Sequence, residues 1–342
     1  VIKSYINNCP KFDIVSHHVP LGLCNAHVFS ANLLGYIDKI TKHPTDREHV
    51  VNFFMKKWWS VIMTKLRPII LTCDNSNRLD TFKIFVESYK KISHTLLSPI
   101  VLVGYNDTKK RDEYNSILYQ LEPYELIEQP TYYTKSDIPT LSKKLPAERY
   151  RNNALLWSNV HRVMVKDFPE IALKYSDGNV IFMEDDICFS SKFSSAIKKV
   201  SEYIETMCDC ITLYSATPKY VDGVKKMLWY EVKHTLETGY RTNPNLPSDD
   251  FIHAIYPYDY WGNQSIIFNR RVVEELSKNW EYIENLSYAW DLNWSQFFNE
   301  NNFKVYATRK SYVQHQMGYS ALENRLKVSA ETDTHTSEVF DE

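Results

Sequence analysis

The chain has 342 residues, of which 44% are apolar and 24% charged, so it has ample material for a core in one large domain or two smaller ones. Its 40 Lys and Arg against 42 Asp and Glu give a formal net charge of −2, which excludes an overall basic signature of nucleic-acid binding. The sequence contains no apolar run long enough to cross a membrane and no recognisable signal peptide. The six cysteines are dispersed, without metal-ligand spacing, and favour a reducing, cytoplasmic location.

Residues 1–66 contain no clear catalytic pattern, and we expect them to form a mainly helical N-terminal appendage. Apolar residues recur at three- and four-residue spacing from Glu48 to Leu66, as on one face of an amphipathic helix. Residues 68–74 then form the first predicted strand, followed by a helix over residues 79–92 and a second strand over residues 99–103. This order predicts a parallel βαβ unit with a right-handed crossover. It carries neither a dinucleotide-binding glycine fingerprint nor a P-loop, so side chains at strand ends would have to bind any nucleotide.

Residues 109–148 are polar and rich in tyrosine, with a short predicted strand over residues 124–127. A helix follows from Arg149 to about Asp167, with Arg151 and Asn152 in its first turn. Basic residues are poor partners for the positive end of a helix dipole, and a nearby anion such as a diphosphate would explain them. The alternative is an ordinary solvated first turn.

The central feature is residues 180–187, where four apolar residues lead into Glu184, Asp185 and Asp186. Such a run, entered through the turn 176–179, predicts a buried strand of a parallel sheet. Acids at the carboxyl end of such a strand lie where open α/β sheets bind ligands. Three adjacent carboxylates repel one another, and their oxygens suit Mg²⁺ or Mn²⁺ shared with substrate phosphates. A solvated acidic turn is the alternative.

The second half alternates between predicted elements and loops. We expect a helix over residues 189–207, a strand over 211–214, and an irregular segment over 215–257 of the kind that forms a substrate loop or lid. A strand over 258–268, the helix Arg270–Lys278 and a strand over 304–308 follow. Asp291 stands at the head of another helix, where the purely structural interpretation is an N-cap. Residues 326–342 form a polar tail.

In their order along residues 67–325, these features resemble the GT-A class of nucleotide-sugar-dependent glycosyltransferases. The resemblance implies an α/β fold with a mixed, mostly parallel sheet flanked by helices, a nucleotide-sugar half (67–187) and an acceptor half (188–325). The residues that carry it are Leu71-Thr72-Cys73-Asp74 with Arg78, Arg151-Asn152-Asn153-Ala154, Phe182-Met183-Glu184-Asp185-Asp186, Trp261-Gly262-Asn263-Gln264, Trp290-Asp291, and Val313-Gln314-His315 with Gly318 and Ser320.

The resemblance also implies roles for individual residues. Asp186 and His315 would hold Mn²⁺ or Mg²⁺ on the diphosphate of a nucleotide-sugar, most simply a UDP-sugar. Residues expected to bind the donor are Thr72, Asp74, Arg78, Arg151, Asn152, Glu184 and Asp185. Residues expected to bind the acceptor are Trp261, Gly262, Trp290 and Trp294. Asp291 would take the proton of the attacking hydroxyl, and in that case the enzyme would be inverting. Asp259 is the reserve candidate, and the stereochemistry stays open.

Other functions and acceptors remain open from the sequence. Strand-end acids also serve nucleotidyltransferases and metal-dependent phosphohydrolases, and a decayed scaffold would be a non-catalytic nucleotide- or glycan-binding module. The acceptor is a glycan, a protein side chain, a small molecule or a hydroxylated DNA base. For the last of these, a local basic face would come from the clusters 109–111, 143–144, 225–226 and 309–310.

Overall fold

The computed structural model describes residues 66–104, 110–146, 148–214, 242–259 and 264–316, and the short strand segments 14–17, 26–29, 219–221, 224–226, 319–320 and 325–326. The chain divides into two compact units, Val1–Met63 and Thr64–Glu342. In the first unit, β1 (Ile14–His17) pairs antiparallel with β2 (Ala26–Phe29). The helix predicted from Glu48 lies outside the described residues except for Leu66, which is not helical. That helix therefore stays a prediction.

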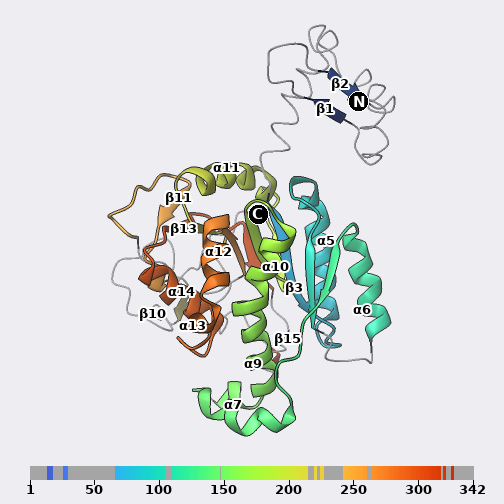
Figure 1. Cartoon of the computed structure of the whole chain (residues 1–342), viewed down its shortest axis with the longest axis vertical. Coiled ribbons are helices and arrows are strands. Elements are labelled where there is room, and N and C mark those ends of the chain that lie inside the picture. The colour runs from blue at the N-terminus through green and yellow to red at the C-terminus, as the bar shows by residue number, and fades with distance from the viewer. Residues whose placement is uncertain are drawn as a thin grey trace. The chain divides into compact units, whose positions relative to one another are not determined.

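The second unit is built on an eight-stranded mixed sheet (Figure 1). In spatial order its strands are β11 (Ile252–Ala254), β13 (Val305–Thr308), β8 (Cys210–Thr212), β12 (Ser265–Phe268), β6 (Val180–Glu184), β3 (Arg67–Cys73), β4 (Ile100–Gly104) and β5 (Glu125–Glu128). The β6-β3-β4-β5 half is parallel, and β8 and β13 are parallel to each other. Strand β12 runs antiparallel to β6 and β8, as β11 does to β13. The predicted α/β class with a mostly parallel sheet is confirmed.

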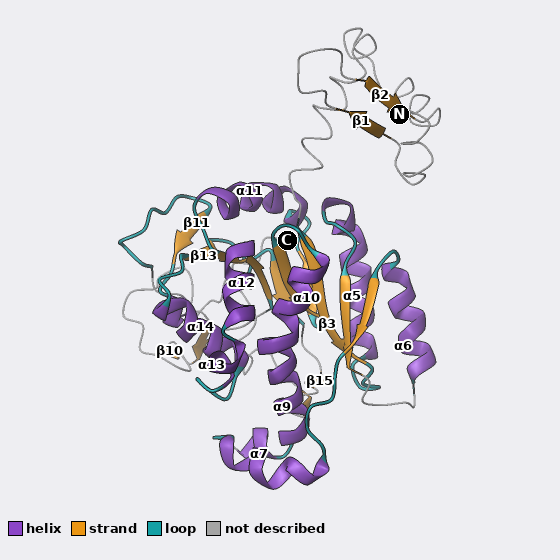
Figure 2. Ribbon diagram, in the orientation of Figure 1, coloured by secondary structure: helices purple, strands orange, loops and turns teal. Residues whose placement is uncertain are grey.

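The sheet is flanked by helices, with α10 and α12 packed side by side over one face (Figure 2). The helices are α5 (Leu79–Ile92), α6 (Arg111–Leu118), α7 (Ile138–Lys144), α8 (Glu148–Arg151), α9 (Ala154–Arg162), α10 (Phe168–Tyr175), α11 (Phe193–Thr206), α12 (Arg270–Lys278), α13 (Trp280–Glu284) and α14 (Trp290–Glu300). Because β3, α5 and β4 follow one another and the two strands are parallel, the predicted βαβ unit is confirmed.

The core lies between the sheet and these helices, and aromatic rings from four elements meet in it. Trp294 of α14 packs against Phe168 of α10, Phe182 of β6 and Phe268 of β12, with ring centroids 5.5, 6.2 and 5.3 Å away. All four side chains are fully buried. Burial of this much aromatic surface ties α14 firmly to the central strand that ends in the acidic residues.

Four predicted elements differ from the structure. The helix predicted from Arg149 to Asp167 is interrupted after α8 and ends in a π-helical turn, Val163–Asp167, before α10. Residues 187–189 form a strand, so α11 begins later than predicted. The segment 215–257, predicted to be irregular, contains β11, and the strand predicted over 258–268 begins only at Ser265. Within the described residues, no helix combines the length and apolar character needed to cross a membrane.

Candidate metal centre and active site

The acidic residues at the end of β6 point in two directions. Glu184 and Asp186 are partly exposed, whereas Asp185 between them is 4% exposed and turned into the protein. Glu184 is the last residue of β6, and Asp185 and Asp186 form the turn that leads into β7, so the backbone changes direction between the three acids. The three carboxylates therefore have separate environments.

A small second sheet brings His315 to this point. Strand β7 (Ile187–Phe189) continues directly from the acids and pairs antiparallel with β14 (Val313–His315), placing His315 opposite Ile187. Gln316 extends the pairing: its backbone N–H donates to the Asp186 carbonyl at 2.6 Å, and its side-chain Nε2 donates to the Ile187 carbonyl at 2.8 Å. The His315 Nε2 atom consequently lies 3.3 Å from Asp186 Oδ2.

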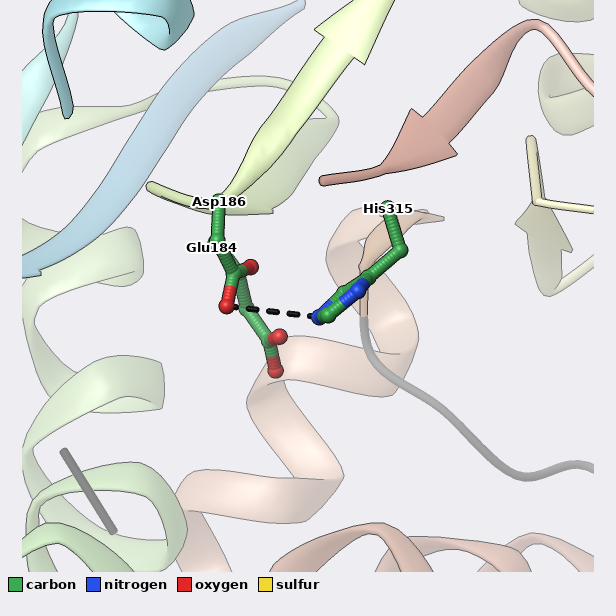
Figure 3. Close-up of side chains that lie close together, drawn as sticks. All are labelled: Glu184, Asp186 and His315. Atoms are coloured by element: carbon green, nitrogen blue, oxygen red, sulfur yellow. Dashed lines mark ion pairs between the residues drawn. The ribbon is translucent and has the colours of Figure 1, made fainter. Parts of the chain in front are cut away.

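Glu184, Asp186 and His315 each offer one ligand atom, and these atoms lie within 4.8 Å of one another. Figure 3 shows both carboxylates and the imidazole directed into one space. Hard carboxylate oxygens suit Mg²⁺ and Mn²⁺, and an imidazole nitrogen shifts the preference toward a transition metal such as Mn²⁺. The donor set therefore fits the expected divalent ion, and it adds Glu184 to the two ligands predicted.

Asp185 and Arg78 form a buried ion pair behind this cluster. The Arg78 guanidinium contacts Asp185 Oδ1 and lies 3.3 Å from Asp186 Oδ2, and Thr72 Oγ1 donates to Asp185 Oδ2 at 2.7 Å. Burial raises the pKa of Asp185, while the charge of Arg78 opposes that shift. Burial lowers the pKa of Arg78, but the two aspartates outweigh burial and raise it overall, so the guanidinium stays charged. The pair places a fixed positive charge beside the cluster.

Asp74, predicted to contact the nucleotide, is held by a residue for which the sequence predicted no role at this site. Its side chain is fully buried. Arg111 of α6 donates from Nε to Asp74 Oδ2 at 3.1 Å, and its terminal Nη2 forms an ion pair with the same oxygen at 3.1 Å. Tyr114 of the same helix hydrogen-bonds Thr72 at 3.0 Å. Neither residue stands in a recognisable motif, and only the packing of α6 on α5 brings them to the site.

Arg151 and Asn152 are exposed at the end of α8. The Arg151 side chain donates to the carbonyls of Leu145 and Pro146 at 2.8 and 2.9 Å. In the structure this guanidinium holds the segment after α7, and its predicted neutralisation of a phosphate stays a prediction.

Asp291 lies partly exposed in the first turn of α14, with Ala289 as the N-cap. The N-cap interpretation of Asp291 is therefore wrong. Trp290 is 7% exposed and packs against Trp157 of α9 with ring centroids 5.7 Å apart. Trp294 is 0% exposed, and its place in the core leaves no ring face for the acceptor contact that was predicted.

Two other predicted acceptor residues, Trp261 and Gly262, lie outside the described residues. The backbone of Asp259 belongs to the 3₁₀ turn Pro257–Asp259. The roles predicted for Trp261, Gly262 and Asp259 therefore stay predictions.

No protein-family model and no curated protein matches the sequence. Similar solved structures include core-mannan synthase A from Aspergillus fumigatus in a Mn/GDP form, with a TM-score of 0.42 and 10% identity over 79% of this chain and 82% of that one. The inositol-1-phosphate CTP transferase of T. maritima has a TM-score of 0.35 and 11% identity over 71% and 85% of the chains. TarS 1-349 of S. aureus has a TM-score of 0.39 and 15% identity over 74% and 60%. Likeness at this level says nothing of the reaction.

Proposed function

We propose that the protein is a metal-dependent glycosyltransferase that moves a sugar from a nucleotide-sugar, a UDP-sugar in the simplest case, to an acceptor hydroxyl with inversion. The observation that carries this proposal is the convergence of Glu184, Asp186 and His315 at the carboxyl end of the central strand. Open α/β sheets bind their ligands at this edge.

The leaving group of such a reaction is a nucleoside diphosphate, on which negative charge develops as the bond to the sugar breaks. A divalent ion held by Glu184, Asp186 and His315 would supply Lewis-acid stabilisation of that charge. Arg78 stands 3.3 Å from Asp186 and contributes a permanent positive charge from the buried side of the cluster. The position of this charge is set by Asp185, so it does not need to reorganise during the reaction.

Asp291 is the candidate general base. It lies in the first turn of α14, a helix packed through Trp294 on Phe182 of β6, the strand that ends in Glu184. A partly exposed carboxylate at this place is able to accept the proton of an acceptor hydroxyl, a contribution of about 10²–10⁴-fold in rate. Direct attack by that hydroxyl on the anomeric carbon gives inversion.

The test is donor binding and turnover measured on a panel of UDP-, GDP-, CMP- and TDP-sugars, with Mn²⁺ and with EDTA. We expect one donor to bind and to be hydrolysed slowly only with Mn²⁺, and Asp186→Asn to lose both activities. The control is Asp250→Asn, an exposed acid in the 242–251 loop. Cleavage within the diphosphate, in place of the bond from sugar to phosphate, would favour a nucleotidyltransferase or phosphohydrolase, and absence of nucleotide binding would overturn the proposal.

A further inference from the structure

A cavity of about 590 Å³ lies outside the acidic cluster, between α9, the end of α7 and the loop that joins α13 to α14. Its lining includes none of the three cluster residues Glu184, Asp186 and His315. Its volume is within the range of about 300–1,000 Å³ found for small-molecule sites. The position of the cavity matters because the same loop leads into the helix that carries Asp291.

One wall of the cavity is aromatic and rigid. The rings of Trp157 and Tyr288 are inclined by 28° with centroids 6.5 Å apart, and Tyr150 packs against both at 4.5 and 5.4 Å. Trp157 Nε1 donates to the Tyr288 carbonyl at 2.7 Å, and His161 Nδ1 hydrogen-bonds the same oxygen at 3.0 Å. Two hydrogen bonds to one carbonyl fix the loop on α9, so the wall is formed before any ligand arrives.

Apart from the apolar residues Leu141, Leu145 and Pro146 at the α7 end, the rest of the lining is mostly polar, and its charge is nearly balanced. Ser158, Asn285 and Ser287 line the cavity and supply hydroxyl and amide groups. The Arg162 guanidinium lies 3.1 Å from Glu284, so these two charges compensate each other and leave Lys144 as the remaining charged residue of the lining. Flat aromatic surface beside uncharged hydrogen-bonding groups is the chemistry that receives a sugar ring, whose C–H face packs on the ring while its hydroxyls bond the polar groups.

The cavity is connected to the proposed reaction centre through packed aromatic side chains. Tyr288 precedes Asp291 in the same short segment, and Trp290 between them packs on Trp157 at 5.7 Å. Further along α14, Trp294 packs on Phe182 of β6 at 6.2 Å. The aromatic wall, the candidate base and the acid-bearing strand therefore belong to one packed unit.

We propose that this cavity binds a sugar ring of a glycan acceptor, with the partly exposed Tyr288, backed by the buried Trp157, as the packing surface and Ser158, Asn285 and Ser287 as partners of the sugar hydroxyls. This inference rests on the proposed glycosyltransferase function and selects the glycan among the acceptors that the sequence leaves open. The balanced charge of the lining disfavours a phosphate-rich acceptor such as DNA, which is bound mainly through Lys and Arg.

The experiment measures binding of the full chain to an array of neutral oligosaccharides, and to a single-stranded DNA oligonucleotide, for the wild type, Ser158→Trp and Ser287→Phe. Both substitutions put a bulky ring into the cavity from different elements. The matched control is Ser98→Trp, which fills a separate cavity of about 320 Å³ beside the start of β4, at the opposite edge of the sheet from the acids. Donor binding with Mn²⁺ is measured on the same samples.

We expect the wild type and Ser98→Trp to bind at least one oligosaccharide of the array, and both cavity-filling variants to bind it at least tenfold more weakly with donor binding unchanged. Wild-type glycan affinity in Ser158→Trp and Ser287→Phe would overturn the inference, as would a wild type that binds donor but no glycan. Binding of the oligonucleotide alone, lost in the two variants, would replace the sugar ring with a nucleobase. A wild type that binds no donor would instead overturn the proposed function. The glycan affinities of the three variants would still show whether the cavity binds a sugar ring.

Discussion

His315 Nε2 lies 3.3 Å from Asp186 Oδ2, although the two residues belong to segments far apart in the chain. The pairing of β14 with β7 produces this proximity, because His315 is the register partner of the residue that follows Asp186. The metal cluster is therefore complete only when β14 is docked on β7 and on the turn after β6.

The first prediction concerns Gln316, which holds β14 against the turn after β6 but is not itself a predicted metal ligand. Its backbone and side chain bond the carbonyls of Asp186 and Ile187. We expect Gln316→Ala to weaken Mn²⁺ binding by about tenfold, the lower end of the effect of groups that orient metal ligands. Calorimetric titration with Mn²⁺ measures this, with Gln120→Ala, an exposed residue at the far edge, as the control. An unchanged Mn²⁺ affinity in Gln316→Ala would show that the register alone positions His315.

The second prediction concerns the ion pair between Arg78 and Asp185. Arg78→Met leaves the Asp185 carboxylate buried without its guanidinium, and breaking a buried pair in this way costs about 3–5 kcal/mol of unfolding free energy. Asp185→Asn in the same chain removes the stranded charge, so the double variant should be less destabilised than the sum of the single variants. Urea unfolding followed by tryptophan fluorescence measures the unfolding free energy of the wild type, the two single variants and the double variant. Lys278→Met, which breaks an exposed pair with Glu275, should change stability by less than about 0.5 kcal/mol.

The third prediction concerns Asp291. If it is the base, Asp291→Asn should lower kcat by about 10²–10⁴-fold and leave the Kd for the donor unchanged, because the proton is transferred only in the reaction. NMR of the product in the wild type should show the anomeric configuration opposite to that of the donor. Glu300→Gln, at the other end of α14, is the control. A retained configuration, or a variant that turns over at the wild-type rate, would remove Asp291 from this role.

The fourth prediction separates the core from the acceptor site at Trp294. Because this side chain is fully buried among Phe168, Phe182 and Phe268, Trp294→Ala should cost about 3–5 kcal/mol of stability. Trp294→Phe keeps most of the packing, and we expect it to leave KM for the acceptor unchanged. A change of tenfold or more in that KM for Trp294→Phe, with stability preserved, would restore the acceptor contact that was predicted from sequence.

Elements with strong local patterns were predictable from the sequence. The apolar runs of β3, β4 and β6 and the periodic face of α5 appear where expected, since burial on both faces of a parallel sheet requires such runs. The strand β7 was missed because it has only three residues, and its partner β14 lies more than 100 residues further along the chain. Short strands paired over long separations carry little local signal.

The site shows the same division between local and tertiary information. The three acids after β6 were evident from the apolar run before them, whereas their separate environments depend on Arg78 and Thr72, which arrive from the neighbouring strand and turn. Trp294 was misassigned because a tryptophan near an acid has the same sequence signal whether it packs inward or faces a ligand. Arg111, which holds Asp74, carries no signal of its own because only the docking of α6 brings it there.

The last prediction follows from His161, which bridges α9 to the start of α14. Its Nδ1 donates to the Tyr288 carbonyl, and its Nε2 accepts a hydrogen bond from Asn293 at 3.0 Å, so the folded protein holds the neutral ring. Burial lowers the pKa of His161 to about 4, and the bond to Tyr288 offsets only part of this. Since the unfolded chain takes up the proton near its usual pKa of about 6.5, the contribution of His161 to stability is intact above that value and is lost as the pH falls toward 4.

Between these limits the unfolding free energy should fall by up to about 1.4 kcal/mol per pH unit for this one group. His161→Gln should reduce the slope of unfolding free energy against pH by the amount that corresponds to uptake of about one proton. Urea unfolding at pH 4.5, 5.5 and 7 measures this slope. His253, which is also buried and has a pKa lowered to about 4 by burial, adds a similar slope from β11. His253→Gln should therefore reduce the pH dependence of the unfolding free energy by a further, additive amount when it is combined with His161→Gln, because the two residues stand on separate elements. A wild-type slope in His161→Gln would mean that the ring takes up its proton as readily in the folded protein as in the unfolded chain, which the hydrogen bond that Nε2 accepts from Asn293 opposes.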